Sequence, residues 1–198
     1  MKPSPNAIAI IARYEGFRSR PYKHGSDPWT IGYGETQGIG PGTAPWTEPY
    51  ARARLVLRVN RDFAPAVDRF RARHSLRWSQ NQFDALTCFA YNLGAATFSD
   101  GAPTGDSLRS ALKSRSVTAV KQALLLYVMP GSQFEVGLRR RRVAEGELFA
   151  KADSRLPRLR AELAQRRAQL QVATERLRRR WLMRRIRSLR RAIAAEKR

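Results

Sequence analysis

The chain has 198 residues, 42% of them apolar, and a formal net charge of +22. This length and apolar share indicate a globular domain with an appendage and exclude a disordered chain. No run approaches 18 apolar residues, so we expect no transmembrane helix, and the apolar run at 7–12 is too short for a signal peptide.

The first predicted elements are a helix and an irregular β-hairpin. An apolar run with Asn6 as its N-cap predicts a helix over about 6–15. The segment 16–45 is rich in glycine and proline, and the alternation within 29–33 is typical of a strand. A small hairpin of this kind is suited to form the wall of a cleft.

Helices dominate from Thr47 onward, because apolar residues recur there every three or four positions. The predicted helices cover about 47–71, 79–93, a segment starting at Asp106, 117–128 and 135–150. We therefore predict an α+β fold for 1–150, mostly helical with one small sheet near the N-terminus. Three aromatic residues are expected in the core: Trp29, Phe83 and Phe89.

Residues 151–198 form a second, strongly basic segment with 17 lysines and arginines against 4 acidic residues. Leucines recur every seven residues up to Leu177, and a second apolar series starts at Leu182, which predicts a broken helix or a helical hairpin. An arginine-rich amphipathic helix favours an anionic membrane surface or wall polymer, whereas the leucine series favours self-association. Nucleic acid is the least favoured partner, because no nucleic-acid-binding motif is present.

Cysteine and histidine are too scarce to indicate a metal site. The single Cys88 excludes an internal disulfide, and its apolar neighbours predict a buried structural thiol. Neither His24 nor His74 has a second ligand at a recognisable spacing. We therefore expect no metal and no cofactor.

The most informative local pattern joins a carboxylic acid to a hydroxyl. Glu15 ends the first predicted helix, and Thr30 lies fifteen residues later in the hairpin. Hydrolysis of a glycosidic bond needs an acid on one side of a cleft and a group that positions water on the other. At the end of an apolar helix the Glu15 carboxyl is partly removed from water, so we expect it to hold its proton more tightly.

Residues 6–150 resemble the phage-type lysozyme (muramidase) family, the glycoside hydrolases used by phages as endolysins. Three segments carry the resemblance: 15–18 with 21–22 and 30–34, then 83–86 with 89–94, then 137–145 with 148–149. The resemblance implies a lysozyme-like fold and hydrolysis of the β-1,4 bond between N-acetylmuramic acid and N-acetylglucosamine in bacterial peptidoglycan. It also implies an enzyme that waits in the host cytoplasm until a separate pore protein releases it to lyse the cell.

In that family the glutamate is the catalytic acid, and the threonine after the hairpin turn orients or contributes to the attack. These residues correspond to Glu15 and Thr30. The family usually has an aspartate six positions before the threonine, where this chain has His24. Asp27 could restore a carboxylate pair about 6.5–9.5 Å apart, the inverting separation, or His24 could itself act as a base or orient water. Alternatively, Asp27 only caps the turn before Pro28.

The resemblance also implies that Arg139 pairs with the catalytic glutamate. Alternatively, Arg139 is a plain surface charge. Tyr22, Tyr33 and Asn92 are candidates to line the sugar cleft, since they offer stacking faces and an amide. Tyr33 and Asn92 also suit structural roles. Glu35 stands where many relatives have histidine, and we interpret it as a loop residue.

Two alternatives accompany the muramidase interpretation. A lytic transglycosylase would leave an anhydro sugar end, and the departure at His24 keeps this reaction open. A basic protein with a decayed lysozyme-like site could instead coat anionic membrane or nucleic acid without catalysis. Glu15 and Thr30 are both present, which favours an enzyme over the second alternative.

Overall fold

The computed structural model describes residues 1–151 together with Glu175 and Arg184. The chain divides into two compact units, Met1–Ala152 and Asp153–Arg198. The helix or helical hairpin expected over 151–198 lies outside the described residues. The assignment of separate functions to 1–150 and 151–198 stays a prediction.

The first element is helix α1, Pro5–Glu15, which follows an N-cap at Ser4. The Ser4 hydroxyl accepts a hydrogen bond from the backbone N–H of Asn6. The prediction of Asn6 as the cap is wrong, because Pro5 already has the fixed φ that suits the first helical turn. The helix ends before Gly16, whose φ of 70° lies in the left-handed region that favours glycine.

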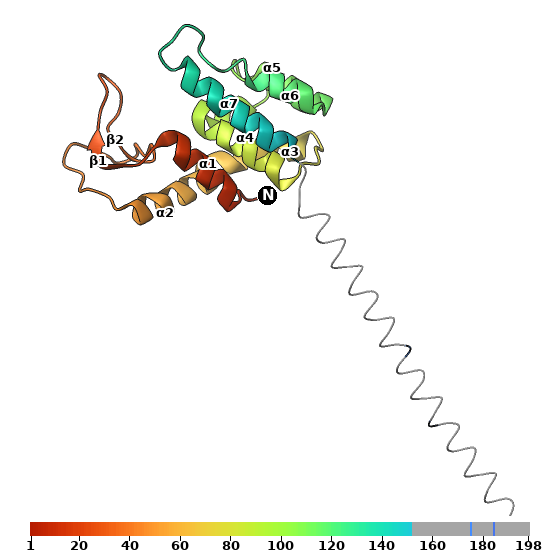
Figure 1. Ribbon diagram of the computed structural model, residues 1–198, viewed down its shortest axis with the longest axis horizontal. Helices are drawn as coiled ribbons and strands as arrows, with labels where there is room; N and C mark the ends of the chain where they lie inside the picture. Colours follow the sequence, from red (N-terminus) through yellow and green to blue (C-terminus); the bar gives the residue numbers. More distant parts are fainter. Residues whose placement is uncertain (152–174, 176–183, 185–198) are drawn as a thin grey trace, which may run out of the picture. The chain divides into compact units, whose positions relative to one another are not determined.

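The predicted hairpin follows α1 as a short antiparallel sheet (Figure 1). Strand β1, Arg18–Tyr22, pairs with β2, Thr30–Gly32, so that Tyr22 lies opposite Thr30. After β2 the chain turns tightly, and Ile31 and Glu35 exchange backbone hydrogen bonds of 2.9 and 3.0 Å. This turn lies directly after the strand that carries Thr30.

The helix predicted over about 47–71 is interrupted by a wider turn. Its parts are α2 (Glu48–Arg58), a π-helical turn (Val59–Phe63) and α3 (Ala64–Arg73). The N–H of Ala64 reaches back five residues to the carbonyl of Val59. The next residue, Pro65, has no N–H to donate, and this missing donor accounts for the break in the regular pattern.

The remaining helices pack around α4, Gln80–Leu93 (Figure 1). Helix α7, Glu135–Ala150, packs along α4, and α1 and α3 contact α4 as well. Helices α5, Asp106–Ser114, and α6, Val117–Leu124, pack on each other, and α6 also contacts α7. Among the residues described, no helix combines the length and apolar content that crossing a bilayer requires.

One predicted helix is shorter than expected. The helix over 117–128 ends at Leu124. The following N–H groups, those of Leu126 and Tyr127, bond carbonyls only three residues back, at 3.2 and 3.1 Å. These tight turns end the regular helix four residues before the predicted boundary.

Two apolar clusters form the core, and α4 contributes to both. The larger contains Phe83 and Phe89, as predicted, and the smaller contains Ile11 and Cys88 beside the hairpin. Trp29 belongs to neither cluster and is only partly buried, so its prediction as a core residue is wrong. It stands immediately before β2 in a sheet of only two strands, which is too small to form a core of its own.

Cys88 is confirmed as a buried thiol with no exposed surface. Its Sγ lies 3.5 Å from the carbonyl oxygen of Ala7 in α1. Burial raises the pKa of the Cys88 thiol well above its usual range, because a thiolate there would lose its hydration. Cys88 is therefore a structural residue of the α1–α4 contact and a poor nucleophile.

Candidate active site

Glu15 is the last residue of α1 and lies where the helix meets the hairpin. Its side chain is 22% exposed, so the carboxyl can be reached from solvent but is largely surrounded by protein. A Cβ built on Gly34 would lie 3.5 Å from Oε2 of Glu15 and 3.4 Å from the Tyr91 hydroxyl. These are ordinary van der Waals separations, and glycine is favoured here because Gly34 has a φ of 91°, in the left-handed region.

The arginine that pairs with Glu15 is Arg141. Its Nη1 donates to Oε1 of Glu15 at 2.7 Å, and the guanidinium is almost completely buried. Arg139, predicted to make this pair, instead bonds Glu135 at 2.9 Å on the surface, so that prediction is wrong. Residues two apart on an α-helix lie a little over half a turn apart, which turns Arg139 toward solvent when Arg141 faces α1.

Arg141 belongs to a chain of ion pairs that runs from Glu15 of α1 to Arg142 of α7. Its Nε lies 3.3 Å from Oε1 of Glu145, a residue with no exposed surface. Arg142 lies 3.1 Å from both oxygens of Glu145, and its Nη2 donates to Oδ1 of Asn92 at 2.8 Å. Glu15, Arg141, Glu145 and Arg142 thus alternate in sign, and we call these four residues the charge chain.

Burial shifts the titration of groups in and beside the charge chain. It raises the pKa of Glu145 to about 7, while Arg142 and Arg141 pull that pKa downward. It also lowers the pKa of Arg142 and raises the pKa of Tyr91 to about 12. Of these three groups, Glu145 is the one whose charge changes near neutral pH.

Thr30 and its two alternative partners lie on or beside the hairpin. The Thr30 hydroxyl donates to the carbonyl of Pro28 at 3.0 Å. Asp27 and His24 are both exposed, and the N–H of Asp27 donates to the carbonyl of His24 at 2.9 Å. The His24 ring packs edge-on against Tyr22 with 5.4 Å between centroids. Asp27 and His24 therefore lie in the same exposed loop. A catalytic role for either of them beside Thr30 stays a prediction.

Two of the predicted cleft residues make structural contacts. Tyr33 is 5% exposed, and its hydroxyl donates to Oε1 of Glu48 at 2.8 Å. A ring buried in this way cannot stack on a sugar, so the prediction of Tyr33 as a substrate-binding residue is wrong. Asn92 is partly buried, and its amide oxygen is occupied by Arg142. Its amide NH₂ is the group that stays a candidate for binding substrate.

Glu35 lies in the loop after β2, as interpreted, but it is a buried carboxylate that supports the turn. Its Oε1 accepts hydrogen bonds from the backbone N–H groups of Thr36 and Gln37, at 3.1 and 3.2 Å. Arg54 and Arg58 of α2 lie 3.5 and 3.8 Å from its carboxylate. Two arginines four residues apart on one helix face are the sequence signal that could have indicated a buried acid.

The tight turn is also tied to the helices. Arg58 donates to the carbonyl of Gly34, and its Nη1 lies 3.4 Å from the Tyr91 hydroxyl. The Tyr91 hydroxyl in turn donates to the carbonyl of Tyr33 at 2.6 Å. These bonds from α2 and α4 hold the backbone beside Glu15 in place. They could not be predicted from sequence, because the partners are 24 to 58 residues apart.

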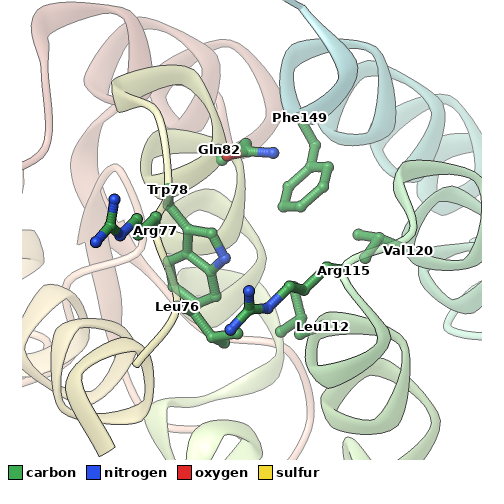
Figure 2. Close-up of a pocket in the computed structure, with 8 residues that line it drawn as sticks. All are labelled: Leu76, Arg77, Trp78, Gln82, Leu112, Arg115, Val120 and Phe149. Carbon is green, nitrogen blue, oxygen red and sulfur yellow. The ribbon is translucent and has the colours of Figure 1, made fainter. Parts of the chain in front are cut away.

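A separate hollow does not offer comparable chemistry. It lies between the segment before α4, the ends of α5 and α7, and α6, with Trp78, Arg115 and Phe149 among its lining residues (Figure 2). No carboxylate lines it, and its volume of about 120 Å³ is below the roughly 300–1,000 Å³ of typical ligand pockets. In the described part of the chain, no three His, Cys, Asp or Glu side chains gather as a metal site would require.

Residues 12–145 match the family model of phage lysozyme. The chain belongs to the phage lysozyme family. The resemblance carried by the three sequence segments is thereby confirmed, and the matched range contains Glu15, Thr30 and the whole charge chain.

Phage endolysins are found among the curated relatives of the chain. The endolysin of Lactococcus phage c2 is 35% identical over 156 residues, which make up 76% of this chain and 61% of that endolysin. The chain thus spans about three-fifths of the length of that relative. The endolysin of Salmonella phage P22 is 25% identical over 142 residues, 72% of this chain and 94% of that protein.

Two solved structures confirm the fold. The muramidase domain of SpmX from Asticaccaulis excentricus is 29% identical with a TM-score of 0.63, and the match covers 76% of this chain and 99% of that domain. A mutant of P22 lysozyme is 26% identical with a TM-score of 0.59, covering 76% of this chain and 99% of that one. The predicted α+β, lysozyme-like fold is therefore confirmed.

Proposed function

We propose that the chain is a peptidoglycan hydrolase, a phage endolysin that cleaves the β-1,4 bond between N-acetylmuramic acid and N-acetylglucosamine. Membership of the phage lysozyme family supports this reaction. The observation that carries the proposal is the position of Glu15, a partly exposed carboxyl held at 2.7 Å by Arg141 where α1 meets the hairpin. A fixed carboxyl beside an open face is what proton donation to a bound sugar requires.

Glu15 acts as the general acid in this proposal. Its carboxyl gives a proton to the glycosidic oxygen as the bond from that oxygen to the anomeric carbon breaks. Arg141 then neutralises the carboxylate that is left. Gly34 has no side chain and leaves the space next to Oε2 of Glu15 open to the substrate.

The second half of the reaction belongs to the exposed hairpin loop. Thr30 orients a water molecule toward the anomeric carbon, and Asp27 or His24 accepts the proton of that water. Attack from the face opposite the leaving oxygen inverts the configuration and gives a reducing muramic acid end. Tyr22, partly buried beside His24, offers a ring on which a sugar can stack.

A lytic transglycosylase is the alternative reaction, which the histidine at position 24 keeps open. In this reaction the 6-hydroxyl of muramic acid attacks its own anomeric carbon in place of water. The hydroxyl proton passes to a base, the glycosidic oxygen takes the proton of Glu15, and the product carries a 1,6-anhydro end. The products of the two reactions therefore differ in molecular mass.

The partners and location of the enzyme follow from this function. Its substrate is the peptidoglycan of the host wall, and we infer that it stays in the host cytoplasm until lysis. The basic residues 151–198 would hold it on an anionic wall polymer or membrane surface, or pair with another copy through their leucines.

The deciding experiment compares the wild type with Glu15→Gln on outer-membrane-permeabilised cells. We expect the variant to lose lysis by about 100-fold or more, because general acid catalysis contributes roughly 10²–10⁴-fold. Glu147→Gln removes the same charge from an exposed site and serves as the control. Equal lysis by wild type and Glu15→Gln, or none by either, would overturn the proposal.

Mass spectrometry of the released sugars separates the remaining alternatives. Reducing muramic acid ends indicate hydrolysis, whereas anhydro ends indicate the transglycosylase. The variants Asp27→Asn and His24→Ala, assayed side by side, then identify the partner of Thr30, since only the loss of the true base should lower the rate severely.

A further inference from the structure

Over residues 136–145, helix α7 buries charged side chains and exposes apolar ones. Arg141, Arg142 and Glu145 are buried, whereas Val136 and Val143 are 62% and 48% exposed. A helix on the surface of a globular domain normally turns its apolar stripe toward the core. This part of α7 has the reverse arrangement, so its outer face shows solvent the kind of side chain that usually packs against protein.

The loop that leads into α7 adds further exposed apolar side chains (Figure 1). Eleven large apolar side chains of the described residues are exposed. Six of these fall within 125–143: Leu125, Leu126, Met129, Phe134, Val136 and Val143. Single exposed apolar residues are normal on a protein surface, but a group of neighbours marks a place where something binds.

The outer side of α7 is hollowed into a groove beside the end of α1. The groove has a volume of about 730 Å³, and none of the described residues that line it is acidic. Its lining combines apolar side chains with three arginines: Tyr14, Val136, Val143, Arg13, Arg139 and Arg140. A complementary partner is therefore apolar in one part and negatively charged in another. We call the groove and the exposed residues of 125–134 the α7 face.

Two arginines of the α7 face are available to an anion. Arg139 already contacts Glu135 at 2.9 Å. Arg13 and Arg140 are both exposed, and neither forms an ion pair with an acidic residue of the described part of the chain. The Arg13 guanidinium lies 5.8 Å from the centre of the Tyr14 ring, so charge and apolar surface adjoin there.

Three kinds of partner could cover this surface, and one fits all of it. A second copy of the chain would bring like charges together, which a net charge of +22 opposes. A small ligand in the groove would leave the exposed side chains of 125–134 in water. An anionic lipid bilayer offers headgroups to the arginines and an acyl boundary that the apolar side chains can enter.

We propose that the α7 face docks the unit Met1–Ala152 on the surface of an anionic lipid membrane. This attachment is separate from any made by residues 151–198, and it needs no chemistry at Glu15. The variant Glu15→Gln should therefore bind vesicles as the wild type does.

The test is sedimentation of the full chain with vesicles of phosphatidylcholine, alone or mixed equally with phosphatidylglycerol. The double variant Phe134→Ser/Val136→Ser should bind the anionic vesicles about tenfold more weakly than the wild type, because it removes two apolar side chains that leave water on docking. Two attachments on one chain multiply their affinities, so the loss is measurable even where 151–198 also bind. Cleavage of dissolved peptidoglycan by this variant should stay at the wild-type rate.

Matched controls come from α2 and α3. The double variant Val56→Ser/Leu57→Ser removes two exposed apolar side chains from α2 and should keep vesicle binding within about twofold of wild type. Arg140→Gln should weaken binding by about fivefold, the contribution of one arginine close to an anionic surface. Arg69→Gln removes the same charge from an exposed position of α3 and should have a smaller effect.

Equal losses in the two double variants, or no loss in Phe134→Ser/Val136→Ser, would overturn the inference. So would unchanged vesicle binding with lost affinity for purified peptidoglycan, which would assign the face to a wall ligand. A dimeric wild type that this variant makes monomeric in analytical ultracentrifugation would assign the face to a second copy and would overturn it too.

A measurement on the wild type decides the matter if the double variant does not fold. On anionic bicelles that contain a nitroxide-labelled lipid, the methyl NMR signals of Val136 and Val143 should broaden, and those of Leu57 should not. Equal broadening at all three residues, or none at the two valines, would overturn the inference.

Discussion

Replacing Arg141 with methionine should destabilise the protein far more than the same change at Arg139. Arg141 is 5% exposed and contacts two carboxylates, one of which, Glu145, has no exposed surface. Removing one member of a buried charge pair costs about 3–5 kcal/mol, because the other charge is left in the protein interior. Arg139 is 53% exposed and contacts Glu135, a surface pair worth about 0.3–0.5 kcal/mol.

The measurement is the thermal unfolding midpoint of the two variants by circular dichroism at neutral pH. For a unit of about 150 residues each kcal/mol lowers the midpoint by about 2–4 °C. Arg141→Met should therefore lower it by about 6–20 °C, and Arg139→Met by no more than about 2 °C. Equal shifts in the two variants, or a larger shift at Arg139, would refute the assignment of Arg141 as the buried partner of Glu15.

Three further predictions follow from other contacts. Tyr33→Phe should cost about 1 kcal/mol in urea unfolding through the lost bond to Glu48 and leave lysis intact; lost lysis with unchanged stability would restore Tyr33 to the cleft. Gly34→Ala should lower the lysis rate at least tenfold, since alanine is strained at a φ of 91° and relief of that strain would shift the turn beside the Glu15 carboxyl; a rate within twofold of wild type would contradict this. With its folded pKa raised to about 7, Glu145 stabilises the fold at low pH, and this contribution is lost as the pH rises through about 7. The free energy of unfolding should thus fall by about 2 kcal/mol between pH 5 and pH 8, but not in Glu145→Gln; equal pH dependence in both proteins would speak against it.

The elements of this fold could be predicted because their signals are local. The apolar residues of α4 and the glycine that ends the helix fall within a stretch of fifteen residues. The alternation that predicts the hairpin strand is equally local. The cap at Ser4 and the π turn before Pro65 were missed, although each depends on a neighbouring proline. In both places the proline changes which backbone N–H groups need a hydrogen-bond partner. The spacing of apolar residues carries no information about these N–H groups.

The candidate site could be predicted only in part. Glu15 and Thr30 were chosen because a family motif places them in one short segment, and their catalytic roles stay a prediction. Arg139 was chosen over Arg141 because nothing in a run of four consecutive arginines indicates which side chain faces the protein interior. The buried contacts of Tyr33 and Glu35 were missed for a similar reason, since their partners Glu48 and Arg54 lie on α2 and become neighbours only after the chain folds.

The burial of Cys88 gives a practical means of studying the basic segment 151–198. It is the only cysteine of the chain, it has no exposed surface, and its raised pKa keeps it as an unreactive thiol. A cysteine introduced anywhere in 151–198 would then be the single site open to a maleimide dye. Without any background mutation, a fluorophore or spin label could report where that segment goes when the protein meets a wall fragment, an anionic vesicle or a second copy of itself.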